Sequence, residues 1–165
     1  IETAAGVLNA HGILSRSTRI CAAAFGAEDY TNDMGIERRR DNDEISYAKN
    51  HVAIAARAAG VPALDTPFFA FRDLDALRRD ADDSRAIGYK GKFAIHPNQI
   101  NIINECFSPS KEEIKHAADV IKAFEEASAR GRGSTSLDGS VVDVPVVKRA
   151  QGLLAAASRM GIIGK

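Results

Sequence analysis

Two carboxylates stand where an α/β protein could bind a metal ion, because each follows a short apolar run. Glu2 follows Ile1, and the Glu28–Asp29 pair closes a longer run that begins at Ile20. Apolar runs followed by Gly and then by a helical pattern are typical of buried parallel strands. Such strands place their carboxyl ends together, at the edge where α/β enzymes keep their chemistry. Oxygen ligands held there suit a hard cation such as Mg²⁺.

Four strand-like runs position these ends. The runs are Ile1–Glu2, Ile20–Phe25, Val61–Asp65 and Lys92–Pro97. Their ends, counted at Glu2, Asp29, Asp65 and His96, are separated on average by roughly 31 residues, the length of one βα unit in a (β/α)8 barrel of about 250 residues. We therefore predict an α/β fold with four parallel βα units.

Helical patterns fill the gaps between the runs. Apolar stripes and stop signals predict helices at Glu44–Ala59, Asp73–Ile87, Asn98–Phe107 and Ser110–Arg130, and a last helix that starts at Asp143–Pro145 and ends near Gly161. Ser110 and Glu113 have the spacing of a capping box. The Gly- and Ser-rich stretch Gly131–Gly139 is predicted to be a hinge.

The chain is therefore expected to have three parts. Residues 1–108 form the second half of a barrel, residues 109–131 a long helix, and residues 132–165 a hinge and lid with the terminal helix. Half a barrel has two open edges and half a core. We therefore expect the other strands to lie upstream of Ile1, which is not a Met, or to come from another chain.

The bulk composition argues against several classes of protein. Lys and Arg together number 22, as do Asp and Glu, so the formal net charge is zero, and nothing favours a nucleic-acid or anionic-membrane partner. No apolar stretch approaches the roughly 20 residues of a membrane span. Cys21 and Cys106 lie in apolar contexts without metal-ligand spacing, which favours reduced core residues in a cytoplasmic protein.

Five strings that follow one another along the chain resemble a known family. They are Ile1–Gly6, Phe25–Tyr30, Gly35–Arg38, Ala63–Pro67 and Gly91–Ile100. In this order they resemble the citrate lyase β-subunit-like branch of the HpcH/HpaI aldolase family, which includes malyl-CoA lyases, citramalyl-CoA lyases and malyl-CoA thioesterases. The resemblance implies a TIM barrel of which this chain holds strands five to eight and a C-terminal helical lid.

The resemblance implies that Glu2 and Asp29 bind Mg²⁺. The chemistry agrees, because a keto acid or hydroxy acid chelates the metal, which then stabilises the alkoxide or enolate formed as a carbon–carbon bond breaks. The alternative is that Glu2 pairs with a barrel Arg and Asp29 caps the following loop. Glu28 points away from Asp29 if both lie in a strand, which favours a supporting role or a helix cap.

A second implied residue lies in the lid. The resemblance implies that Asp143 enters the active site of an adjacent subunit as an acid or base, in a homo-oligomer that is a trimer or hexamer. The alternative is that Asp143 is an N-cap before Pro145. Asp138 is the weaker candidate, because Asp-Gly is also an ordinary turn.

Three residues at later strand ends are candidates for substrate binding. Asp65 either lines the pocket or caps the next turn. His96 and Pro97 end the fourth run. His96 is expected either to bind substrate or phosphate, or to be a structural histidine held by hydrogen bonds. The basic run Arg38–Arg40 is expected to bind a CoA phosphate. The alternatives are an intersubunit ion pair and a solvated loop.

The resulting hypothesis is a Mg²⁺-dependent carbon–carbon lyase. It would cleave a β-hydroxyacyl-CoA of the citramalyl-CoA or malyl-CoA type to acetyl-CoA and an α-keto acid. Thioester hydrolysis, as in a malyl-CoA thioesterase, is the closest alternative, because water could replace the carbon nucleophile at the same site. A non-catalytic citrate lyase-like subunit is the alternative from a different class.

Overall fold

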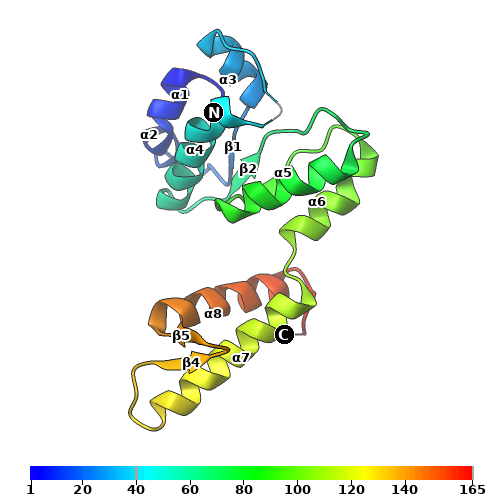
Figure 1. Ribbon diagram of the computed structural model, residues 1–165. Helices are drawn as coiled ribbons and strands as arrows, with labels where there is room; N and C mark the ends of the chain where they lie inside the picture. The colour runs from blue at the N-terminus through cyan, green and yellow to red at the C-terminus, as the bar shows by residue number, and fades with distance from the viewer. Residues whose placement is uncertain (40, 165) are drawn as a thin grey trace. The chain divides into compact units, whose positions relative to one another are not determined.

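The computed structural model describes residues 1–39 and 41–164. It divides the chain into two compact units, Ile1–Phe107 and Ser108–Lys165 (Figure 1). No helix within the described residues is long and apolar enough to cross a membrane. Each unit is described by itself below.

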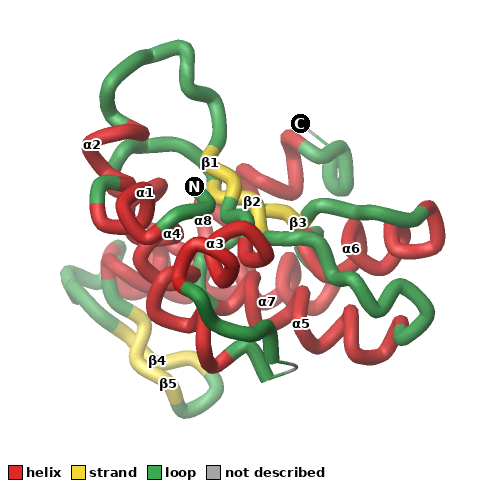
Figure 2. The backbone as a smooth tube through the Cα atoms, turned by 90° about the horizontal axis from the view of Figure 1, so that it is seen from above, coloured by secondary structure: helices red, strands yellow, loops and turns green. Residues whose placement is uncertain are grey.

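The first unit alternates short strands with helices. In chain order its elements are α1 (Ala4–Leu8), α2 (Ala10–Leu14), β1 (Ala23–Ala24), α3 (Ala27–Met34), η1 (Asp43–Ile45), α4 (Ser46–Ala58), β2 (Ala63–Asp65), α5 (Leu74–Ala86), β3 (Gly91–Lys92), η2 (Pro97–Gln99) and α6 (Ile100–Phe107). The strands form one parallel sheet in the order β1-β2-β3, and Figure 2 shows them in a row. Parallel strands in chain order confirm the predicted α/β class, whereas their identity as barrel strands stays a prediction.

Ile1 extends this sheet beyond β1. Its amino group donates to the carbonyl of Ala24 at 2.7 Å, and its carbonyl accepts from the N–H of Gly26 at 3.0 Å. In a parallel ladder, one residue forms hydrogen bonds with the two residues that flank its partner on the adjacent strand. Ile1 therefore lies beside Phe25, as the predicted strand stub requires.

The core of the first unit packs α4 against the sheet. Ile45, Ala48 and Val52 are fully buried on one stripe of the predicted helix. Phe25 and Tyr30 join the same core, with their ring centroids 5.7 Å apart. The small side chains of α4 let the helix approach the strands closely, as expected for a helix that covers a parallel sheet.

The strands are shorter than predicted. The run Ile20–Phe25 contributes only Ala23–Ala24 as a strand, and the run Lys92–Pro97 ends as a strand at Lys92. At the second site the side-chain oxygen of Gln99 accepts from the backbone N–H of Ile95 at 2.9 Å and of His96 at 3.3 Å. Because these donors are satisfied locally, the ladder does not continue to Pro97.

Asp65 lies in a buried cluster of charges. Its Oδ2 accepts from Lys92 Nζ at 2.6 Å and from Ser84 Oγ at 2.7 Å, and Lys49 Nζ lies 3.1 Å away. Asp80 completes the cluster, 2.5 Å from Lys92 Nζ. Lys49 belongs to α4 and Ser84 to α5, so the carboxylate points into the layer between the sheet and its helices. Asp65 is fully buried here, and its predicted role at a pocket wall or as a cap of the next turn stays a prediction.

The second unit is a helical hairpin with a small β-ribbon. Its elements are α7 (Lys111–Ser128), β4 (Thr135–Leu137), β5 (Ser140–Val142) and α8 (Val144–Arg159). The predicted capping box forms, with Ser110 Oγ accepting from Glu113 N at 3.1 Å and Glu113 Oε2 accepting from Ser110 N at 2.8 Å. α7 therefore begins where the sequence indicates.

The predicted hinge is partly a β-hairpin. β4 pairs with β5 in antiparallel register, and Leu137 lies opposite Ser140. Asp138 and Gly139 both have positive φ, 49° and 78°, which is the conformation that a two-residue hairpin turn needs. Asp138 is thus a turn residue, and the hinge Gly131–Gly139 contains ordered structure from Thr135 onward.

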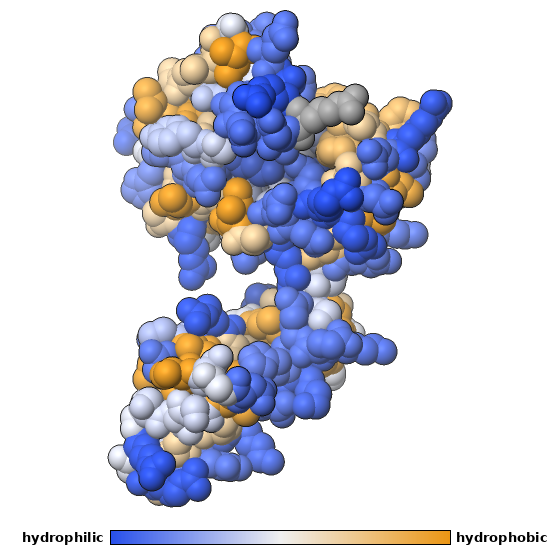
Figure 3. Space-filling model, viewed as in Figure 1, coloured by the Kyte–Doolittle hydropathy of each residue, from blue (hydrophilic) through white to orange (hydrophobic). Residues whose placement is uncertain are grey.

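The apolar face of α8 packs within its own unit. Val147 and Ala150 are buried against Ala117 and Val120 of α7, together with Val142 of the hairpin. α7 therefore covers the apolar face of the predicted last helix. Some apolar surface of the unit remains open, including Val141 and Val144; apolar atoms appear orange in Figure 3.

The buried cluster yields a stability prediction. Asp65→Asn should lower the free energy of unfolding by about 3–5 kcal/mol at neutral pH, because two buried lysines lose a counter-charge. Urea unfolding measures this. Glu105→Gln is the control, since Glu105 forms an exposed pair with Arg78, and it should leave the midpoint nearly unchanged. Equal midpoints for Asp65→Asn and wild type would contradict the prediction.

The same comparison has a pH dependence. Burial acts to raise the pKa of Asp65, but the charges of Lys92 and Lys49 and the hydrogen bonds from Lys92 and Ser84 outweigh it, so the pKa lies below its usual value. A carboxyl whose pKa is lower in the folded state stabilises the protein above its unfolded pKa, about 3.9, and loses that contribution as the pH falls through the folded pKa. The difference in free energy of unfolding between wild type and Asp65→Asn should therefore become smaller below about pH 4.

Candidate metal and substrate site

Glu2 is held in place by backbone contacts on both sides. Ile1 lies in the ladder with β1, and Thr3 caps α1 by accepting from Gly6 N at 3.0 Å. The side chain of Glu2 packs against Gly26, because a Cβ on Gly26 would lie 2.9 Å from both Cβ and Oε2 of Glu2. Only glycine leaves room for this carboxylate.

Asp29 lies at the start of a helix and not at the end of a strand as predicted. Glu28 and Asp29 do not end a strand; they occupy the first turn of α3, which begins directly after Gly26. Carboxylates are favoured in a first helical turn because the helix dipole is positive there. The strand-alternation argument for Glu28 therefore fails. Glu2 packs against Gly26, which is the N-cap of α3 and lies three residues before Asp29.

The two carboxylates fit a hard cation. Both are exposed, and within the described residues neither side chain has a hydrogen-bond or ion-pair partner. The described part of the chain holds no group of three or more His, Cys, Asp or Glu side chains arranged to hold a metal. Two protein oxygens would leave several positions on a Mg²⁺ ion for water and a chelating substrate.

Three tethers fix the position of α3. The N–H of Ala27 donates to Thr66 Oγ1 at 3.3 Å, just beyond the end of β2. The N–H of Ala4 donates to Asp33 Oδ2 at 2.8 Å. Glu28 accepts from Arg38 Nε at 3.0 Å. An isolated helix of eight residues is not stable in water, so these contacts, together with the burial of Ala27 and Tyr30 in the core, hold α3 in place.

Arg38 does not serve as a free phosphate ligand. Besides Glu28, its guanidinium binds Glu44 and Asn42. Arg39 pairs with Asp41 at 2.8 Å, in an exposed position. Arg40, the third member of the basic run, lies outside the described residues. A CoA phosphate would therefore have to compete with three existing acceptors at Arg38.

His96 and Pro97 are exposed and form a cap. The ring nitrogen Nδ1 of His96 accepts from Asn98 N at 3.2 Å, and Pro97 opens η2. The His96 ring stacks on Phe71, with centroids 4.8 Å apart and planes 17° apart. The structural role predicted as the alternative for His96 is therefore present, and substrate binding by His96 or Pro97 stays a prediction.

Asp143 likewise takes the role given as its alternative. It is the N-cap of α8, and its Oδ1 accepts from Val146 N at 3.1 Å. The side chain is partly exposed. A cap uses one carboxylate oxygen, so the other remains available for a proton transfer.

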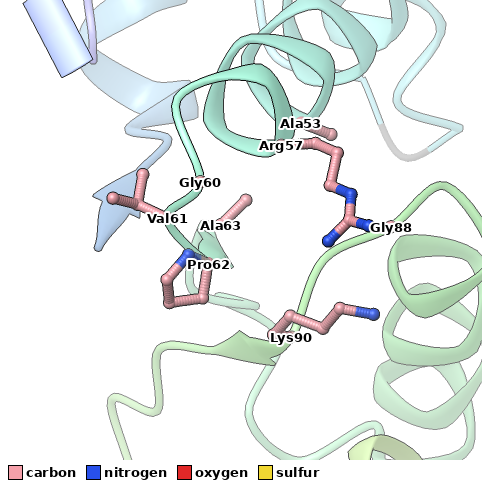
Figure 4. A pocket seen from close by; sticks show the side chains of 8 residues that line it. All are labelled: Ala53, Arg57, Gly60, Val61, Pro62, Ala63, Gly88 and Lys90. Carbon is pink, nitrogen blue, oxygen red and sulfur yellow. The ribbon is translucent and has the colours of Figure 1, made fainter. Parts of the chain in front are cut away.

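A hollow of about 170 Å³ lies at the opposite end of the strands. It is bordered by Arg57 and Lys90 and by the segment Gly60–Ala63 that leads into β2 (Figure 4). In α/β barrels the amino ends of the strands serve stability, whereas the carboxyl ends carry chemistry. The hollow is therefore not assigned to the site of Glu2 and Asp29.

The sequence did not identify the partners of Asp65. Lys49, Asp80 and Lys92 each lie in a separate element, and only packing brings them to Asp65. A signal was available for Lys92, because a lysine inside a buried strand needs a counter-charge. For Lys49 and Asp80 the helical patterns contain no comparable signal.

The packing of Glu2 on Gly26 yields a prediction. Gly26→Ala should displace the Glu2 side chain and weaken Mn²⁺ binding roughly tenfold, the usual effect of disturbing groups that orient metal ligands. Titration followed by electron paramagnetic resonance measures free Mn²⁺. Gly12→Ala is the control, because a Cβ there meets nothing within 4 Å. Unchanged affinity in folded Gly26→Ala would show that Glu2 does not hold the ion from this position.

Comparison with known proteins gives a consistent family. A sequence profile of the HpcH/HpaI aldolase/citrate lyase family matches residues 1–97. The citrate lyase subunit beta of Leuconostoc mesenteroides subsp. cremoris is 42% identical over 158 residues, which cover 96% of this chain and 52% of that protein. The mitochondrial citramalyl-CoA lyase of Rattus norvegicus is 35% identical over 166 residues, which cover 96% of this chain and 49% of that protein. The chain thus spans about half the length of these relatives.

Solved structures agree with this result. The protein CitE of Mycobacterium tuberculosis, in complex with magnesium, acetoacetate and coenzyme A, superposes with a TM-score of 0.83 at 30% identity. The match covers 96% of this chain and 59% of that chain. The family predicted from the five strings is therefore confirmed, and the chain belongs to the HpcH/HpaI aldolase/citrate lyase family.

Proposed function

We propose that this chain carries the metal-binding part of a Mg²⁺-dependent carbon–carbon lyase. The substrate is a β-hydroxyacyl-CoA of the citramalyl-CoA or malyl-CoA type, and the products are acetyl-CoA and an α-keto acid. The observation that carries the proposal is the pair Glu2 and Asp29, two exposed carboxylates that have no partner among the described residues. Glu2 packs against the N-cap Gly26 of α3, and Asp29 lies in the first turn of α3.

The relatives support this reaction class. The two relatives compared above are a citrate lyase subunit and a citramalyl-CoA lyase. The M. tuberculosis neighbour is in complex with magnesium, a small keto acid and coenzyme A. Magnesium and coenzyme A are also components of the proposed reaction, whereas acetoacetate is a β-keto acid and the proposed product is an α-keto acid.

The roles of the residues follow from their positions. Glu2 and Asp29 hold Mg²⁺ through carboxylate oxygens and leave the remaining positions open to the keto-acid portion of the substrate. When bound, the ion supplies Lewis-acid polarisation of the oxygen next to the bond that breaks. Gly26 keeps Glu2 in place, and the tethers of α3 keep Asp29 in place.

Asp143 is proposed to move the proton at the acetyl carbon. In the cleavage direction the substrate hydroxyl loses its proton to water, the carbon–carbon bond breaks to leave a keto group and the enolate of acetyl-CoA, and protonated Asp143 delivers a proton to the enolate carbon. In the reverse reaction Asp143 removes that proton. The same residue caps α8, so its position is fixed by its own unit. We propose that it completes the site of an adjacent subunit in a trimer or hexamer.

The products separate the lyase from the thioesterase. A lyase releases acetyl-CoA and a keto acid, whereas a thioesterase releases free CoA and the hydroxy acid. Incubation of the native full-length protein with citramalyl-CoA, malyl-CoA and citryl-CoA, followed by chromatography of the products, distinguishes these reactions and ranks the acyl groups. Absence of carbon–carbon cleavage with all three would contradict the proposed lyase.

A substitution at Asp29 tests the metal role. Asp29→Asn should abolish Mg²⁺-dependent turnover, because the amide removes one of only two charged ligands. The fold should be retained, since Asp29 is exposed and has no partner among the described residues. Coupled assays with and without EDTA, with circular dichroism for the fold, measure both effects. Full activity of wild type in EDTA would refute the metal requirement.

A substitution at Asp143 tests the lid. Asp143→Ala should lower kcat by about 10²–10⁴-fold, the usual contribution of a general acid or base, with little change in Mg²⁺ affinity. Mixing this variant with Asp29→Asn should restore part of the activity, because some mixed sites then contain both residues. If subunits exchange and no activity returns, Asp143 does not act across subunits.

A further inference from the structure

Arg38 joins three separate segments of the first unit. Its Nε donates to Glu28 Oε1 on α3 at 3.0 Å, and one terminal nitrogen donates to Asn42 Oδ1 at 2.9 Å. The other terminal nitrogen binds Glu44 Oε1 in η1, at the entry to α4. The Arg38 side chain is 23% exposed and that of Glu44 only 8%. Each guanidinium nitrogen thus has its own acceptor.

The contacts continue from Asn42 into the core. Asn42 has a left-handed backbone, with φ 61°, and its side-chain amide donates to Asp80 Oδ1 at 2.8 Å. The other oxygen of Asp80 lies 2.5 Å from Lys92 Nζ, which in turn binds Asp65. An unbroken polar chain therefore runs from the first turn of α3 to the buried charge cluster behind β2.

This chain bears on the candidate metal site through α3. Glu28 and Asp29 are neighbours in the first turn of a helix of eight residues, and the pair Glu28–Arg38 is one of its three tethers. Through Arg38 and Asn42 this exposed pair connects α3 to the buried charges of Asp80, Lys92 and Asp65. A substitution at Arg38 should therefore change the orientation of the Asp29 side chain.

We propose that Arg38 is a positioning residue for the metal site, which it orients by holding Glu28 against the loop that leads to α4. The inference rests on the proposed function above. Charge alone predicts the opposite effect, because removal of a nearby cation would strengthen the binding of another cation. The sign of the change in metal affinity therefore separates positioning from simple electrostatics.

The test measures Mn²⁺ affinity by electron paramagnetic resonance in the native full-length protein. Arg38→Gln should weaken binding about 10- to 100-fold, the range found when groups that support metal ligands are removed. Arg38→Lys should restore only part of it, because an ammonium cannot supply a planar fork to three acceptors. Glu28→Gln should also weaken Mn²⁺ binding. The double variant should bind Mn²⁺ no more weakly than the single variant with the lower affinity.

Arg39→Gln is the matched control. Arg39 is the next residue and carries the same charge, but among the described residues its side chain pairs only with exposed Asp41, so Mn²⁺ affinity should stay at the wild-type value. Hydrogen exchange over residues 27–34, measured without metal, should be faster in Arg38→Gln and unchanged in Arg39→Gln. If Arg38→Gln does not fold, Arg38→Lys decides, because it keeps the positive charge and removes only the planar fork; weaker Mn²⁺ binding in this variant cannot come from a change of charge.

The outcomes separate this inference from the proposed function. Wild-type or tighter Mn²⁺ binding in folded Arg38→Gln, or wild-type binding in Glu28→Gln, overturns the positioning role. If wild type itself does not bind Mn²⁺, or Asp29→Asn binds it equally well, the proposed metal site fails instead. Weaker binding together with faster exchange in α3 supports the positioning role.

Discussion

The two backbone hydrogen bonds between Ile1 and β1 determine where the candidate site forms. They place Ile1 beside Phe25 in parallel register, so the next residue on each segment, Glu2 and Gly26, must also be neighbours. Because Gly26 has no Cβ, the carboxylate of Glu2 fits against it. α3 begins at the following residue, and its first turn brings Asp29 to the same end. The metal-binding hypothesis thus depends on the register of one ladder.

Much of this arrangement could be predicted from local signals. The order of strands and helices followed from apolar runs and stop signals, and Asp73, Ser110 and Asp143 cap helices at the predicted positions. The family followed from five ordered strings and is confirmed by the profile match. Local signals suffice for such features because caps and apolar stripes act within a few residues of one another.

Other features depend on contacts between distant residues. Asp65 ends a strand as predicted, but its partners Ser84 and Lys92 lie 19 and 27 residues away, and its orientation toward the helices follows from them. Glu28 and Asp29 were predicted to end the apolar run that begins at Ile20. The run ends before Gly26, and both residues belong to α3. The stretch Gly131–Gly139 was predicted to be a hinge from its composition, whereas the pairing of β4 with β5 turns the chain back so that α8 packs on α7. In each case tertiary contacts decide the structure.

A crystal structure of the native full-length protein with Mg²⁺ and pyruvate tests the central claim most directly. The account predicts one ion at the start of α3, with an oxygen of Glu2 and an oxygen of Asp29 each about 2.0–2.1 Å from it. The keto acid should occupy two of the remaining positions. An ion bound elsewhere, or bound without either carboxylate, would contradict the account.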